Sequence, residues 1–129
     1  MKRENFSSDS PWEDIVGYSR AVRVGNTLEI SGTVALNDQN KVIGAGDPYT
    51  QTYFILSKIE KICVRAGFTL RDIVRTRLYV TDISKWEEFG KAHGEYFKNI
   101  KPCTSMIEVS RLISEDYLVE IEVTAVLSK

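Results

Sequence analysis

The segment Tyr117–Leu127 restricts the possible folds more than any other part of the chain. Its odd-numbered positions from 119 to 127 are all apolar, whereas the even-numbered positions mix apolar residues with Glu120 and Glu122. Because successive side chains of a β-strand point to opposite faces, this alternation predicts a strand with one buried face. The other face is too apolar for a freely solvated surface and too charged for a dry core. We therefore expect an interface lined with polar pockets on that side.

Two segments have helical spacing and can cover the buried face. The first begins with Asp47 as N-cap and Pro48 as first helical residue, and Gly67 follows it as a C-terminal cap. Its apolar side is Ile55, Leu56, Ile59, Ile62, Cys63 and Ala66. The second begins at a capping box, Ser84–Glu87. Its apolar side is Trp86, Phe89, Ala92, His93, Tyr96 and Phe97.

The order of the elements predicts an α+β fold. Strands are expected at Ala21–Val24, Thr27–Ser31, Thr33–Leu36, Val74–Thr81, Cys103–Arg111 and Tyr117–Leu127. With the two helices this gives the order β-β-β-α-β-α-β-β, which favours a mixed six-stranded sheet with both helices packed on one face. Residues 1–14 are polar and are predicted to be an N-terminal arm whose Trp12 docks on the body. Residues 15–129 then form a single domain.

Charge and motifs exclude several classes of protein. The formal net charge of -1 gives no basic field for duplex binding, so a small neutral or zwitterionic partner fits better. The chain has one histidine and no P-loop, G-x-G-x-x-G, G-x-S-x-G or H-E-x-x-H motif, so we expect no metal and no nucleotide cofactor. Cys63 and Cys103 lie far apart and follow no apolar leader, which favours reduced thiols and a cytoplasmic location. The apolar runs are strand-sized, so no membrane partner is expected.

Three candidate groups for chemistry each have a structural alternative. Glu120 and Glu122 project on the same side of a strand about 7 Å apart, where two carboxylates can divide acid and base work. Alternatively they are solvated, or form salt bridges with Arg75 and Arg77. His93 lies on an apolar helix side and is interpreted as a packing residue rather than a general base. Cys103 is interpreted as buried and inert rather than nucleophilic.

Several blocks of the sequence together resemble the RidA/YjgF family. They are Gly17–Arg20, Gly25–Asn26, Ile30–Gly32, Val74–Asp82, Lys101–Leu112 and Val119–Glu122. They occur in unbroken order from about Ile15 to Leu127, and the last two blocks at their mutual spacing are the most specific. The resemblance implies a chorismate-mutase-like subunit, a homotrimer and ligand clefts between neighbouring subunits.

The resemblance also implies an activity and a set of site residues. The best understood members are imine deaminases, which need no cofactor and hydrolyse enamines and imines such as 2-aminoacrylate and its imine tautomer to 2-keto acids and ammonia. By position, Glu120 would place the attacking water and the main-chain carbonyl of Met106 would orient the imine nitrogen or the water. The remaining cleft positions are Tyr18, Ser31, Gly32 and Trp86, with Cys103 and Ser105 beside the anchor position.

Thr104 departs from the family pattern at a catalytic position. The deaminases have an arginine there that binds the substrate carboxylate as a bidentate fork, and a neutral, monodentate hydroxyl cannot replace it. The chain therefore resembles the branch that lacks this arginine, for which hydrolysis of 2-iminopropanoate cannot be assumed. Whether another arginine replaces it is left open; the candidates are Arg20, Arg75, Arg77 and Arg111.

Three functions remain open from the sequence. The first is hydrolysis of a small imine or related C=N compound, with Thr104 bonding an uncharged or weakly charged group. The second is capture of a small metabolite without turnover. The third is an endoribonuclease or translation inhibitor, which the acidic balance disfavours.

Overall fold

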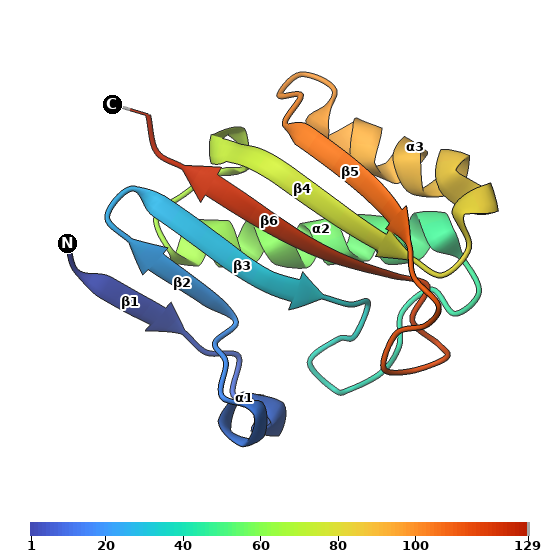
Figure 1. The fold of residues 1–129 in the computed structure, drawn as a ribbon, viewed down its shortest axis with the longest axis horizontal. Coiled ribbons are helices and arrows are strands. Elements are labelled where there is room, and N and C mark those ends of the chain that lie inside the picture. Colours follow the sequence, from blue (N-terminus) through green and yellow to red (C-terminus); the bar gives the residue numbers. More distant parts are fainter. Residues whose placement is uncertain (129) are drawn as a thin grey trace.

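The computed structural model describes residues 1–128, which form a six-stranded mixed sheet with two long helices against one face (Figure 1). The strands are β1 (Arg3–Phe6), β2 (Ala21–Val24), β3 (Thr27–Thr33), β4 (Ile73–Val80), β5 (Cys103–Glu108) and β6 (Val119–Val126). Their order across the sheet is β1-β2-β3-β6-β4-β5. Only the β4–β5 pair among them is parallel. The predicted α+β class is confirmed.

Strand β6 lies at the centre of the sheet and separates the two faces as predicted. Val119, Ile121 and Val123 are buried beneath the helices, together with Ala125. Glu120 and Glu122 point to the face that no helix covers, called the open face below. Full burial of each valine or isoleucine contributes about 1.5–3 kcal/mol, so the alternation alone fixes which side of β6 faces the helices.

Helix α2 (Pro48–Arg65) forms where the sequence predicts it. The Asp47 side chain accepts a hydrogen bond from the Thr50 amide at 3.1 Å, and Pro48 occupies the first turn, where its missing amide is not needed. After the helix, Gly67 adopts a left-handed conformation with φ of 87°. The side of α2 that packs on β3 and β6 is fully buried at Ile55, Leu56 and Ile59.

Helix α3 (Trp86–Phe97) begins differently from the prediction. The predicted capping box, Ser84–Glu87, is replaced by a different contact. The Asp82 side chain accepts a hydrogen bond from the Ser84 amide at 3.0 Å. A short 3-10 helix, η2 (Ile83–Lys85), then leads into α3. An aspartate readily binds the amide two residues further on, and this local turn takes the place of the capping box. Phe89 and Phe97 are buried, but Trp86 is 56% exposed.

The N-terminal residues differ most from the prediction of an arm. Residues 3–6 form β1, which pairs with β2 at the edge of the sheet, and α1 (Pro11–Val16) follows with Ser10 as N-cap. An edge strand pairs through its backbone, so the polar sequence of β1 carried no alternation to reveal it. Trp12 is 61% exposed and does not dock on the body. Instead Glu13 is buried and accepts a bond from the Ser8 amide at 3.0 Å.

The predicted strand Thr33–Leu36 does not form. Strand β3 continues to Thr33, and Leu36 makes only an isolated bridge with Val42. The β3–β6 register shifts between Ile30 and Thr33, so the segment around Ser31 and Gly32 departs from regular pairing. A further 3-10 helix, η1 (Leu70–Asp72), precedes β4. None of the helices within residues 1–128 combines the length and apolar composition needed to cross a bilayer.

Candidate functional site

Glu120 lies directly over Gly32 on the open face. A methyl group added at Gly32 would overlap the Glu120 carboxylate, so the absence of a side chain there leaves the space that the carboxylate occupies. Glu120 is half-buried, and this burial raises its pKa above the usual glutamate range. The charge of Arg20 partly opposes the rise in pKa, and Glu122 adds to it. The site therefore has a partly desolvated carboxylate with increased affinity for a proton.

Arg20 is held by the protein beside Glu120. Its Nη2 donates to the Gly32 carbonyl at 2.6 Å, and its buried Nε has no hydrogen-bond partner within residues 1–128. Burial lowers the pKa of Arg20. Lys58, close enough to feel the charge of Arg20, donates to the Val34 and Leu36 carbonyls, and burial lowers its pKa to about 8. These two cations are bonded to main-chain carbonyls and support the backbone near Glu120.

Glu122 has partners that Glu120 does not share. It accepts a hydrogen bond from the Tyr79 hydroxyl at 2.7 Å, and its Oε1 lies 3.8 Å from Nη1 of Arg77. The bond to Glu122 raises the pKa of Tyr79. Of the two interpretations from the sequence, the salt bridge to Arg77 therefore applies to Glu122. Glu120 is the carboxylate that occupies the space left by the missing side chain of Gly32.

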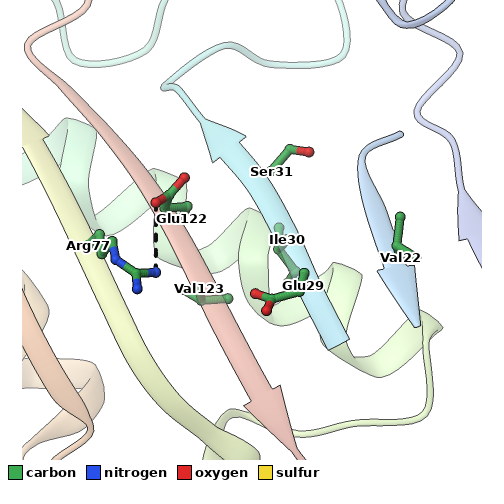
Figure 2. Close-up of a pocket in the computed structure, with 7 residues that line it drawn as sticks. All are labelled: Val22, Glu29, Ile30, Ser31, Arg77, Glu122 and Val123. Atoms are coloured by element: carbon green, nitrogen blue, oxygen red, sulfur yellow. Dashed lines mark ion pairs between the residues drawn. The ribbon is translucent and has the colours of Figure 1, made fainter. Parts of the chain in front are cut away.

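Figure 2 shows the residues that line a depression on the open face; they come from β2, β3, β4 and β6, and Arg77 is directed at Glu122. Its volume is about 250 Å³. Its lining residues are Val22, Glu29, Ile30, Ser31, Arg77, Glu122 and Val123. The open face is therefore polar and hollowed, as the sequence of β6 predicts.

Thr104 lies on the opposite side of the sheet from Glu120. In the parallel β4–β5 pair Thr104 is level with Thr76, and Met106 is level with Leu78, so both point to the helix-covered face. The Thr104 hydroxyl is 2.8 Å from that of Thr76 and 3.2 Å from the Pro102 carbonyl oxygen. The Met106 side chain packs against the core. Edge strand β5 thus brings Thr104 to the rim of the sheet.

Cys103 corrects one interpretation from the sequence. It is exposed at the start of β5, not buried, because β5 is an edge strand. Cys63 is the buried thiol, and burial raises its pKa to about 12. Ser105 is half-buried and level with Arg77. Arg111 is exposed after β5.

His93 is a packed and hydrogen-bonded side chain, as predicted. Its ring centroid is 4.7 Å from that of Phe97, and its Nε2 is 2.9 Å from the Thr76 hydroxyl. Burial lowers its pKa to about 4, so the imidazole is neutral at pH 7.

The structure brings together only part of the predicted set. Ser31 donates through its hydroxyl to the Ser19 carbonyl at 2.7 Å and through its amide to the Arg20 carbonyl at 3.0 Å, which places the segment after Tyr18 beside Ser31, Gly32 and Glu120. Trp86, by contrast, is exposed at the start of α3. Strand β4 lies between β6, which carries Glu120, and β5, which carries Thr104. Glu120 and Thr104 therefore lie apart, on opposite faces of the sheet, in one copy of the chain.

Sequence reasoning missed the roles of Thr76 and Tyr79, which depend on strand pairing. The Ser-Gly-Thr run in an apolar strand pattern was a signal for the irregularity at Gly32. No group of three or more His, Cys, Asp or Glu side chains within residues 1–128 is arranged to hold a metal ion.

These features define an α+β protein whose sheet has one helix-covered face and one polar open face. Residues 9–127 match the family model described as Endoribonuclease L-PSP. The chain belongs to this family, which contains the RidA/YjgF proteins.

Relatives and solved structures agree with this assignment. A RutC family protein of Sulfurisphaera tokodaii is 38% identical over 118 residues, which is 92% of this chain and 93% of that protein. The crystal structure of Rv2704, a YjgF/YER057c/UK114 family member from Mycobacterium tuberculosis, is 46% identical with a TM-score of 0.88, covering 98% of this chain and 100% of the other. YyfA of the Rid family from Yersinia pestis is 30% identical with a TM-score of 0.84, covering 98% and 100%. The sequence resemblance is thereby confirmed.

Proposed function

We propose that the protein is a homotrimer that hydrolyses a small C=N compound in clefts between its subunits. The separation of Glu120 and Thr104 within one copy supports this assembly, because a site containing both residues needs a second copy of the chain. Exposed apolar residues beside the charged groups of the open face, among them Val24 and Val126, favour burial against another copy. A solution mass of three times 14.7 kDa is the expected result; the mass of a single chain would contradict the assembly.

The proposed reaction adds water to an imine carbon. Glu120 accepts a proton from the water as the water oxygen bonds to the imine carbon and the electron pair of the C=N π bond moves to the nitrogen. Glu120 passes that proton to the nitrogen, and the nitrogen also receives the remaining hydroxyl proton as the C–N bond breaks. The oxygen becomes the carbonyl oxygen, and the nitrogen leaves as ammonia. A carboxylate with a raised proton affinity suits this role, because a general base works best when its pKa approaches the working pH. The observation that carries the proposal is the half-buried Glu120 carboxylate over Gly32, in contrast to Glu122, which Tyr79 and Arg77 engage.

The proposed substrate has a neutral group where the deaminases bind a carboxylate. Removing a charge-assisted contact to a carboxylate costs about 2–5 kcal/mol, so Thr104 disfavours 2-iminopropanoate strongly. Arg20 and Arg77 do not restore the anchor in this proposal, since Arg20 binds the Gly32 carbonyl and Arg77 faces Glu122.

A matched pair of substrates tests the proposal. Hydrolysis of 2-iminopropanamide and 2-iminopropanoate is followed for the native protein, Thr104→Arg, Glu120→Gln and the control Glu122→Gln. We expect the native protein to hydrolyse the amide faster, Thr104→Arg to shift the preference to the carboxylate, and Glu120→Gln to lose both activities. Rates equal to buffer for every variant would refute the catalytic proposal.

The alternative is a trimer that binds a small metabolite without turnover. Binding without turnover is favoured by one observation: the Thr104 hydroxyl already forms hydrogen bonds with Thr76 and Pro102 within the chain. Stabilisation by the stable product analogue pyruvamide, without hydrolysis of either imine, would establish it. A ribonuclease function, as the family description suggests, is less supported, because the open face carries Glu29, Glu120 and Glu122. The free thiols of Cys63 and Cys103 support the proposed cytoplasmic location.

A further inference from the structure

A chain of hydrogen bonds connects the interior to the rim of the sheet at Thr104. It starts at His93 on α3, passes through the Thr76 hydroxyl at 2.9 Å, and reaches the Thr104 hydroxyl after a further 2.8 Å. Thr76 is fully buried, whereas Thr104 is exposed at the edge strand. The Pro102 carbonyl oxygen, 3.2 Å from the Thr104 hydroxyl, is a second acceptor at the outer end.

The hydrogen bonds between His93, Thr76 and Thr104 can point in either of two directions, because a neutral imidazole nitrogen either accepts or donates. If Nε2 of His93 accepts, Thr76 donates its proton to His93, and Thr104 donates its proton to Thr76. If Nε2 carries the proton, His93 donates to Thr76, Thr76 donates to Thr104, and Thr104 donates to the Pro102 carbonyl. A hydroxyl has one proton and two lone pairs, so the single proton of Thr104 is used within the protein in both directions.

What Thr104 offers to a ligand is therefore the same in both directions. At least one lone pair of its oxygen stays available, while an acceptor on the ligand would have to displace Thr76 or Pro102 from the proton. An arginine at this position would offer only donors. The residue thus has the opposite hydrogen-bonding polarity to the arginine of the deaminases.

We propose that the ligand places a hydrogen-bond donor, such as the N–H of a neutral amide, against Thr104, and that Thr76 and His93 are positioning residues that impose this requirement. The inference rests on the proposed function, which puts Thr104 in the cleft. The inference restricts the substrates to neutral C=N compounds that carry a hydrogen-bond donor at this position. A ligand with only acceptors there, such as an ester, would place one of its lone pairs against a lone pair of the Thr104 oxygen.

Two stable probes with the same carbon skeleton, pyruvamide and pyruvate, test the ligand requirement. Their dissociation constants are measured by NMR titration for the native protein, Thr104→Val, Thr76→Val and Thr76→Ser. One hydrogen bond contributes about 1 kcal/mol, so the preference for pyruvamide over pyruvate should fall about fivefold in Thr104→Val and Thr76→Val. It should persist in Thr76→Ser, which keeps the hydroxyl. Comparing the ratio within each variant removes the constant repulsion of pyruvate by Glu120.

The single histidine gives an independent readout in the ligand-free protein. The ¹⁵N shifts of the two ring nitrogens report which one carries the proton. We expect the Nε2 shift to change in Thr76→Val and to return toward the native value in Thr76→Ser. Imidazole shifts that are alike in all three proteins would show that the Thr76 hydroxyl does not determine the hydrogen bonding of His93.

The outcomes separate this inference from the proposed function. Binding of both probes with an unchanged ratio in Thr104→Val and Thr76→Val would overturn the donor requirement. Imidazole shifts unaffected by Thr76→Val would overturn the role of His93 and Thr76. Binding of neither probe by any variant would overturn the proposed cleft, and the ligand assignment with it. The expected ratios together with the expected shifts would support the inference.

Discussion

Replacing Gly32 by alanine tests whether the space beside Glu120 is needed for function. The added methyl would overlap the carboxylate, and the Cδ and Cγ atoms of Glu120 are also too close to it, so the side chain must rotate away. Gly32 is outside the left-handed region that favours glycine, so alanine can adopt its backbone conformation. The substitution therefore moves Glu120 while it preserves the strand.

The expected change in folding free energy is small. Restricting the unfolded chain by replacing glycine with alanine stabilises by about 0.4–1 kcal/mol. Holding the Glu120 side chain away from a preferred rotamer costs about 0.5–1.5 kcal/mol. The two nearly cancel, so we expect the free energy of unfolding to change by less than about 1 kcal/mol. Turnover, in contrast, should fall by about 10²–10⁴-fold, the usual contribution of a positioned general base.

The assay combines denaturant unfolding with hydrolysis of 2-iminopropanamide for Gly32→Ala, Glu120→Gln and the double variant. The control is Gly94→Ala, since a methyl group at Gly94 in α3 meets no atom of residues 1–128 within 4 Å apart from its chain neighbours and the backbone of its own helix. We expect the double variant to be no slower than Glu120→Gln alone, because both changes remove the same group. Full activity of Gly32→Ala, or additive losses in the double variant, would refute the role assigned to Glu120.

Further predictions concern charge, thiols and packing. Because the folded pKa of Glu120 lies above its ordinary value of 4.5, its ionisation destabilises the fold as the pH rises above that value. Glu120→Gln should therefore melt at a higher temperature than the native protein at pH 7 and not below pH 4, whereas Glu122→Gln, which loses the charged acceptor for Tyr79, should melt lower at pH 7. Exposed Cys103 should react with a thiol reagent at pH 8, while Cys63, with a pKa of about 12, should react only on unfolding; equal rates would contradict their placement. Ile59→Ala in the core should lower the free energy of unfolding by about 2–5 kcal/mol in denaturant titrations, and a loss below 1 kcal/mol would contradict its full burial.

The parts of the fold that bury apolar side chains were predictable from the sequence. The alternation in β6 and the apolar side of α2 determine which surfaces meet, and burial enforces both. Strand β1 was not predictable in this way, because it pairs through its backbone and leaves its polar side chains exposed. The start of α3 differs from the prediction because the Asp82 side chain accepts a hydrogen bond from the Ser84 amide, and this contact takes the place of the predicted capping box.

The sequence supplies candidate residues for the proposed site but does not supply their geometry. The sequence identified Glu120 and Thr104, but strand pairing decided that they occupy different faces. Pairing also decided that Glu122 meets Tyr79 and Arg77, and that Thr104 meets Thr76 and through it His93. Such contacts join residues far apart in the chain, and no local spacing encodes them.

Subunit mixing is the most direct measurement of the central claim, which is that Glu120 of one copy and Thr104 of another form one site. Glu120→Gln and Thr104→Arg chains are unfolded together, refolded and assayed with 2-iminopropanamide, with each variant refolded alone as the control. Mixed trimers contain clefts in which both residues are native, so hydrolysis should reappear at a level above that of either variant alone. Activity of the mixture equal to the average of the two separate variants would contradict a site shared between copies.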